Sequence, residues 1–324
     1  EALDLGMRKV DLVNQFHHLI WLGDLNYRID LSREKILTLI EQNFHDGLLR
    51  GDQLLREKDK LRTFYAFNEG KIQFWPTYRY ERGNNEWSKK KLKNVPSYCD
   101  RVLWRSISGL KIHQKYYSAC MDLMTSDHRA VHTLFTTEVK TCIPAAPDQL
   151  CQMLLETETY PSFQLIFYNL ELTRVEEAIE PLLTKTPNKR TSLKSVIGIG
   201  GTDDVEEKKV VVVDNIVLRA PFLPSVTHYI PLQRIIEGQT WRSKQELDIV
   251  GPFQCLPQSL RKEYMLVQVY SGSEDMVIGS TVIPLYDNVI QGSNWPICCS
   301  VTYRGILWGY LTAEIEIKQL TDFH

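Results

Sequence analysis

The feature that most restricts the fold of this chain is an apolar run that ends in a small polar turn. Phe16 and Leu19 to Leu22 are largely apolar and predict a buried strand. Gly23 frees the backbone at the end of the run, and Asp24 and Asn26 follow two residues apart. In an extended chain these two side chains lie on the same side, which predicts an acid and an amide delivered together at a strand end. The same residues are typical of an ordinary turn, so both interpretations stay open.

Two later segments repeat the arrangement of an acid in front of an apolar run. Asp100 follows Pro96-Ser97-Tyr98-Cys99 and precedes residues 101–104, and Asp127 stands beside His128 in front of another apolar stretch. A histidine can be cationic near neutral pH, and a neighbouring carboxylate raises its pKa. By itself, an Asp-His pair more often forms a surface hydrogen bond. The occurrence of the three motifs in this order is what indicates a catalytic site.

In this order the motifs resemble those of the inositol polyphosphate 5-phosphatases, a metal-dependent family related to DNase I. Pro76-Thr77-Tyr78-Arg79-Tyr80-Glu81-Arg82 and Asn94-Val95-Pro96-Ser97 are most similar to the SH2-domain-containing inositol 5-phosphatases. The resemblance covers residues 15–137 and implies an α/β layered sandwich of the DNase I-like type. It also implies an enzyme that uses Mg²⁺ to hydrolyse the 5-phosphate of phosphatidylinositol 3,4,5-trisphosphate, giving the 3,4-bisphosphate lipid. A phosphodiesterase of the nuclease branch is a second interpretation.

The resemblance assigns roles to individual side chains. Asp24 would take a proton from the attacking water or hold it in line, and Asn26 would contact the water or a phosphoryl oxygen. His128 would stabilise the charge on the phosphoryl group, with Asp100 as its partner and Asp127 as a metal ligand. The residues expected to bind the neighbouring 4-phosphate are Tyr78, Arg79, and Lys91 or Lys93.

The family's catalytic domain begins upstream of Glu1 with an asparagine, a magnesium-binding glutamate and a further histidine. Those motifs do not occur in these residues. We therefore expect residues 1–140 to be the C-terminal part of a catalytic domain, with uncovered strand edges and apolar faces. The chain by itself is then expected to be inactive. A catalytically inactive membrane-binding or scaffold fragment is the alternative interpretation.

Past residue 140 the pattern changes to short strands separated by turns rich in Gly, Pro, Ser and Asn. Residues 141–147 are the predicted linker, and residues 148–320 are predicted to form a β-sandwich. Its position behind this phosphatase resembles that of a C2 domain. The elements expected along the chain are helices after Ser32 and over Leu48–Leu55, and strands at 101–106, 111–117, 131–138, 163–172, 209–213, 215–218, 263–270, 276–284 and 311–318.

Composition limits the partners and the compartment. A net charge of -2 over 324 residues argues against general nucleic-acid binding. Apolar runs of about 18 residues are absent from the sequence, so we expect no membrane span. The resemblance implies a cytoplasmic protein that is recruited peripherally to the anionic plasma membrane. The basic stretch Lys185–Lys194 is either a solvated loop or a membrane contact. Seven cysteines without C-x-x-C spacing indicate reduced thiols, with Cys99 buried.

Overall fold

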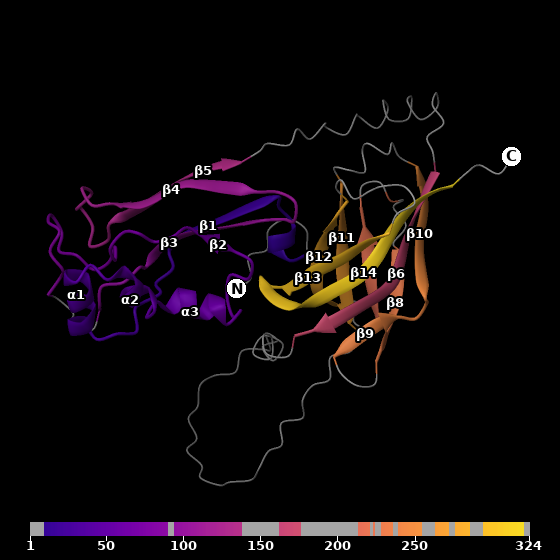
Figure 1. Cartoon of the computed structure of the whole chain (residues 1–324), viewed down its shortest axis with the longest axis horizontal. Helices are drawn as coiled ribbons and strands as arrows, with labels where there is room; N and C mark the ends of the chain where they lie inside the picture. The colour runs from indigo at the N-terminus through magenta and orange to yellow at the C-terminus, as the bar shows by residue number, and fades with distance from the viewer. Residues whose placement is uncertain are drawn as a thin grey trace, which may run out of the picture.

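The computed structural model describes residues 10–89, 94–137, 162–175, 213–220, 223, 228–235, 239–254, 263–271, 276–285 and 294–320. Figure 1 shows two groups of elements, which we call the site module (residues 10–137) and the β module (residues 162–320). In the described part of the chain, no helix is long and apolar enough to cross a membrane. The predicted linker at 141–147, the basic stretch 185–194 and residues 209–212 of a predicted strand lie outside the described residues. The domain boundaries drawn there stay predictions.

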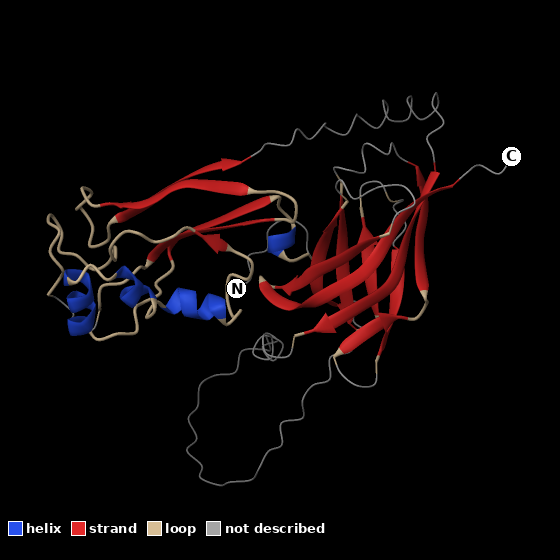
Figure 2. Ribbon diagram, in the orientation of Figure 1, coloured by secondary structure: helices blue, strands red, loops and turns tan. Residues whose placement is uncertain are grey.

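The site module is built on a three-stranded antiparallel sheet in the order β1-β3-β2. A separate hairpin of β4 and β5 and three short helices lie beside this sheet (Figure 2). The predicted strands at 101–106, 111–117 and 131–138 are confirmed, with small differences at their ends. The elements are β1 His18–Asp24, α1 Arg33–Glu41, α2 His45–Leu49, α3 Gln53–Asp59, β2 Asn68–Glu69, β3 Asp100–Ser106, β4 Ile112–Cys120 and β5 Ala130–Thr137.

Strand β1 is only half buried, although its sequence predicts a buried strand. Exposed and less exposed residues alternate along it, and Ile20 and Leu22 are 45% and 66% exposed. The described residues leave this face of the sheet uncovered, so the apolar side chains on it meet solvent. An uncovered apolar face is what the sequence predicts for residues 1–140.

The helices begin at recognisable caps. Ser32 accepts a hydrogen bond from the backbone N–H of Lys35 at 3.3 Å, which confirms the predicted start of α1. The single helix predicted over Leu48–Leu55 is wrong, because α2 ends at Leu49 and α3 begins at Gln53. Gly51 is a poor helix former, and Asp52 starts a new helix by accepting a hydrogen bond from Leu55 N at 2.9 Å.

The β module is one antiparallel sheet in the order β10-β6-β14-β13-β12-β11-β7-β8-β9. Its ends meet because the 13-residue β6 pairs with β10 along its first half and with β9 along its second half. The predicted all-β sandwich is confirmed, and its two faces belong to a single sheet that closes on itself. The strands are β6 Ser162–Arg174, β7 Asn215–Arg219, β8 His228–Arg234, β9 Thr240–Ser243, β10 Leu247–Gln254, β11 Tyr264–Ser271, β12 Met276–Pro284, β13 Trp295–Tyr303 and β14 Ile306–Leu320.

A short 3₁₀ helix, η1 (Leu12–Asn14), connects the two modules. The Nδ2 of Asn14 donates to the backbone oxygen of Ser280 at 2.8 Å and to Thr302 Oγ1 at 2.9 Å. Its Oδ1 accepts a hydrogen bond from Arg105 Nη2 on β3 at 3.1 Å. We call these four residues the interface cluster. All four are buried, so each hydrogen bond replaces one that water would otherwise make.

We expect Asn14→Ala to lower the free energy of unfolding by about 2–3 kcal/mol, because it leaves the buried Arg105 and Thr302 without this partner. Urea unfolding followed by tryptophan fluorescence measures the change. The control is Gln42→Ala, which removes an exposed amide from the end of α1. An Asn14→Ala protein that unfolds at the wild-type urea concentration would show that the interface cluster adds no stability.

Candidate active site

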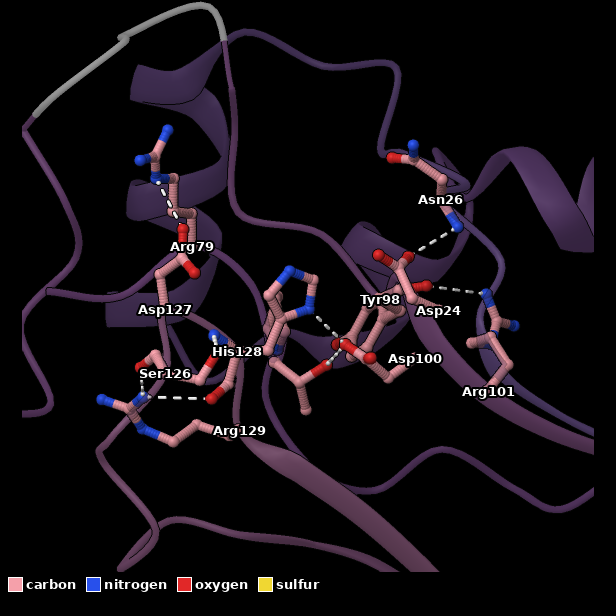
Figure 3. Close-up of polar contacts among 12 residues, drawn as sticks. Asp24, Asn26, Arg79, Tyr98, Asp100, Arg101, Ser126, Asp127, His128 and Arg129 are labelled. Atoms are coloured by element: carbon pink, nitrogen blue, oxygen red, sulfur yellow. Dashed lines mark hydrogen bonds and ion pairs between the residues drawn. The ribbon is translucent and has the colours of Figure 1, made fainter. Parts of the chain in front are cut away.

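Two carboxylates meet at one end of the sheet in the site module. The antiparallel register of β1 and β3 places Asp24, the last residue of β1, opposite Asp100, the first residue of β3. Leu25 N donates to Cys99 O at 2.8 Å and so continues the pairing past the strand end. Figure 3 shows the two carboxylate side chains next to each other. The sequence places both acids at strand ends, and the structure brings them together.

The segment after β1 is a turn, not an extended chain. Asn26 has a left-handed backbone with φ 59°, and its N–H donates to Asp24 Oδ1 at 2.9 Å. The expectation that strand alternation puts the two side chains on the same side is therefore wrong for this pair. A side-chain oxygen that binds the N–H two residues on is a common turn of aspartate. The turn interpretation is confirmed, and because the turn keeps Asn26 beside Asp24, the site interpretation stays a prediction.

His128 lies two residues before β5 and bonds to one of the two carboxylates, that of Asp100. Its Nδ1 lies 2.7 Å from Asp100 Oδ2, and Thr77 Oγ1 donates to the same oxygen at 3.4 Å. The ring of Tyr78 packs against the imidazole with 4.6 Å between the ring centroids. The structure thus brings together Asp24, Asn26, Asp100 and His128 from three separate sequence motifs (Figure 3).

The environment of His128 favours its cationic form. The hydrogen bond to Asp100 raises the pKa of His128 above its ordinary value, while burial acts in the opposite direction. The charges of Asp100, Asp24 and Asp127 raise it further. A histidine held in this way can present a positive charge to an anionic group near neutral pH.

We expect NMR titration of the His128 ring, without added metal, to give a pKa above 6.5. Its contribution to stability is then fully present below pH 6.5 and is lost as the pH rises through the raised pKa. Asp100→Asn removes the charge but keeps a hydrogen-bond acceptor, so it should lower the pKa of His128. Asp122→Asn, at an exposed residue, should leave the pKa of His128 unchanged. A native pKa at or below 6.5 would contradict this assignment.

Arg79 and Asp127 form a pair of their own. Arg79 Nε lies 3.2 Å from Asp127 Oδ2 without hydrogen-bond alignment, and Arg82 Nη2 lies 3.9 Å from Asp127 Oδ1. In Figure 3 this pair lies on the other side of His128 from Asp24. Both residues are predicted site residues, but here each neutralises the other. Lys91 and Lys93 lie outside the described residues, so their role stays a prediction.

The described residues do not by themselves complete the predicted magnesium site. Within residues 10–89 and 94–137, and in the described strands of the β module, no three His, Cys, Asp or Glu side chains gather in a group that would hold a metal ion. Asp127, the predicted ligand, has arginines next to both of its oxygens. Two further carboxylates lie nearby, but an oxygen of each already accepts a hydrogen bond. These oxygens are Oδ1 of Asp24 and Oδ2 of Asp100.

Sequence reasoning missed two arginines of this region. Arg28 donates from Nε to Asn26 Oδ1 at 3.0 Å, and its guanidinium lies 4.4 Å above the ring of Tyr78. Arg101 is buried behind Asp100 and binds two carboxylates, those of Asp52 and Glu69. The signal for Arg28 was its place two residues after Asn26, at the end of the first motif. An arginine at the start of an apolar strand was the signal for Arg101.

Residues 2–134 match the family described as "Endonuclease/Exonuclease/phosphatase family 2". The human phosphatidylinositol 3,4,5-trisphosphate 5-phosphatase 2 is 36% identical over 200 residues, which are 55% of this chain and 16% of the human protein. This chain is a homologue of the inositol polyphosphate 5-phosphatases. The rat phosphatidylinositol 3,4,5-trisphosphate 5-phosphatase 1 is 27% identical over 341 residues, and this alignment covers 98% of the chain. The chain spans 16% and 24% of the lengths of these two relatives.

Two solved structures are also similar to this 5-phosphatase homologue. One is the inositol polyphosphate 5-phosphatase domain of SPsynaptojanin in complex with inositol (1,4)-bisphosphate and calcium ion. It is 29% identical, with a TM-score of 0.35, over 44% of this chain and 40% of that chain. The other is the ferrous NO complex of Cimex nitrophorin, 31% identical with a TM-score of 0.36, over 38% of this chain and 42% of that chain.

Proposed function

We propose that, within its full-length protein, this 5-phosphatase homologue hydrolyses the 5-phosphate of phosphatidylinositol 3,4,5-trisphosphate and releases the 3,4-bisphosphate lipid. The observation that carries the proposal is the meeting of Asp24, Asp100 and His128 at one end of a sheet, with His128 bonded to Asp100 at 2.7 Å. The relatives named as phosphatases of this lipid support the choice of substrate.

Hydrolysis of a phosphate monoester requires a water held in line and a positive charge near the phosphoryl oxygens. Asp24 accepts hydrogen bonds and can orient the water or take its proton. The imidazolium of His128 stabilises the negative charge that develops on the phosphoryl group, and Asp100 keeps the ring oriented. Mg²⁺ is the cofactor that we propose, since it prefers carboxylates, waters and phosphate oxygens and would add positive charge at the phosphate.

The lipid substrate implies a peripheral membrane protein. We propose that the chain acts in the cytoplasm and is recruited to the plasma membrane through the anionic headgroup, with Tyr78 and Arg79 beside the 4-phosphate. A guanidinium can bind a phosphate through two hydrogen bonds, which makes Arg79 suited to this role once the substrate competes for it with Asp127.

The test is phosphate release by the full-length protein from vesicles that contain the 3,4,5-trisphosphate lipid, with Mg²⁺ present and with His128→Ala as the comparison. Turnover above about 1 per second that is lost in the variant supports the proposal. Equal release by both proteins would contradict it. The alternative is an inactive lipid-binding module, and the absence of a metal-ligand group among the described residues favours it. Binding to the vesicles without any release would support that alternative.

Arg79→Ala is expected to lower kcat/KM about 10- to 150-fold on substrates with a 4-phosphate, because one charge-assisted hydrogen bond contributes about 1.5–3 kcal/mol. Analogues without the 4-phosphate should be hydrolysed at nearly the wild-type rate. The control is Arg82→Ala, whose side chain is 75% exposed and lies farther from Asp127. Equal losses on both substrates would mean that Arg79 only holds its loop.

A further inference from the structure

The side chain of Arg28 is directed at one atom of the candidate site. Its Nε donates to Asn26 Oδ1 at 3.0 Å, and its Nη2 also contacts the same oxygen. An amide has a carbonyl oxygen that accepts and an NH₂ group that donates. A guanidinium has only donors, so it binds the amide only through the oxygen. The hydrogen-bond network therefore fixes which end of Asn26 faces Arg28.

We propose that Arg28 is a positioning residue that holds the Asn26 amide in one orientation, with Nδ2 turned outward as a donor to a phosphoryl oxygen. This inference rests on the proposed function. The sequence leaves two roles open for Asn26, contact with the water through its oxygen or contact with the phosphate through its nitrogen. Because Arg28 occupies the oxygen, the structure assigns the second role.

Arg28 is itself held from two sides. Its backbone N–H donates to Gln53 Oε1 at 3.0 Å, and its backbone oxygen accepts a hydrogen bond from Gln53 N at 2.9 Å. Its guanidinium lies 4.4 Å from the centroid of the Tyr78 ring, a distance at which a cation is attracted to an aromatic face. A side chain that is fixed in this way can impose an orientation on a mobile amide.

The same contacts connect Arg28 to the other catalytic candidates. The Tyr78 ring that faces Arg28 also packs against His128, and Asp24 holds the backbone of Asn26. Arg28 further lines a cavity of about 520 Å³ whose wall includes Asp30 and Asn94. Arg28 thus contacts Asn26 and also lines this cavity.

The first test reads the amide directly and needs no turnover. The full chain is labelled with ¹⁵N-asparagine and titrated with inorganic phosphate, and the Asn26 side-chain signal is identified by its loss in Asn26→Asp. We expect phosphate to shift this signal in the wild type and in Arg28→Lys, which keeps a donor-only side chain. The shift should be lost in Arg28→Gln, because glutamine also offers an acceptor and lets the amide turn round. Arg62→Gln, at a side chain that is 61% exposed, is the control.

The second test separates positioning from direct binding of the substrate. Arg28→Gln should lower kcat about tenfold in the wild-type background and should have no further effect in Asn26→Ala. A loss that persists in Asn26→Ala would mean that Arg28 binds the phosphate itself and would overturn the inference. An Asn26 signal that fails to shift in the wild type, or that shifts equally in Arg28→Gln, would also overturn it. A chain that releases no phosphate but shows the expected shifts would contradict the proposed function and support the role of Arg28.

Discussion

Replacing His128 by alanine is expected to lower turnover by about 10²–10⁴-fold, the usual effect of losing one acid–base group. The reason is the loss of the imidazolium charge that Asp100 maintains through its 2.7 Å hydrogen bond to Nδ1. The side chain is partly exposed, so its removal should leave the fold intact. The measurement is the rate of phosphate release with the 3,4,5-trisphosphate lipid, together with the thermal unfolding curve of each protein.

His113→Ala is the matched control, since it removes an exposed histidine from the neighbouring strand β4. It should leave the rate unchanged. Asp24→Ala should cost about as much as His128→Ala if the carboxylate orients the attacking water. Near-normal turnover by the Asp24 or the His128 variant would show that the residue is structural.

The largest expected effect on stability is that of Arg101→Met. Arg101 has a fully buried side chain that binds both oxygens of Asp52 at 2.9 Å through Nη1. Its Nε and Nη2 bind the two oxygens of Glu69 at 2.7 and 2.8 Å. Methionine would leave two buried carboxylates without the cation that bonds to both of them. Breaking a buried ion pair by removing one partner costs about 3–5 kcal/mol, so the free energy of unfolding should fall by that amount.

Urea unfolding measures this loss, and Arg56→Met is the control because Arg56 pairs with Asp30 where both side chains are 43% exposed. An exposed pair contributes little, so the control should unfold almost like the wild type. The deficit of Arg101→Met should shrink as the pH falls, because a protonated carboxyl group no longer requires a cation. An Arg101→Met protein as stable as the control would mean that Asp52 and Glu69 find other partners.

The parts of the site that the sequence predicts are those with a local signal. Asp24 and Asp100 each stand at the end of an apolar run, and the antiparallel pairing of β1 with β3 then brings them together. The cap at Ser32 is likewise local, since its partner is three residues away. By contrast, Arg101 meets Asp52 and Glu69 across 49 and 32 residues, and no spacing pattern marks such partners.

In the β module the strands that sequence reasoning missed lack a clear alternation. β8 contains Pro231, which usually argues against a strand, and β9 has only four residues. The pairing of β10 with β6 shifts register between Val250 and Phe253, so its pattern is interrupted. The closure of the sheet through β6 and β9 depends on pairings between distant segments, which short-range periodicity does not reveal.

The interface cluster has a consequence for the order in which the chain matures during synthesis. Asn14 leaves the ribosome before its partner Thr302, which follows 288 residues later. At about 5–20 residues per second, the interval between the two is roughly 15–60 s. Throughout that time the Nδ2 of Asn14 has water or a chaperone as its partner instead of Ser280 on β12 and Thr302 on β13. In the nascent chain, the side-chain amide of Asn14 therefore makes all its hydrogen bonds only after β12 and β13 have been synthesised.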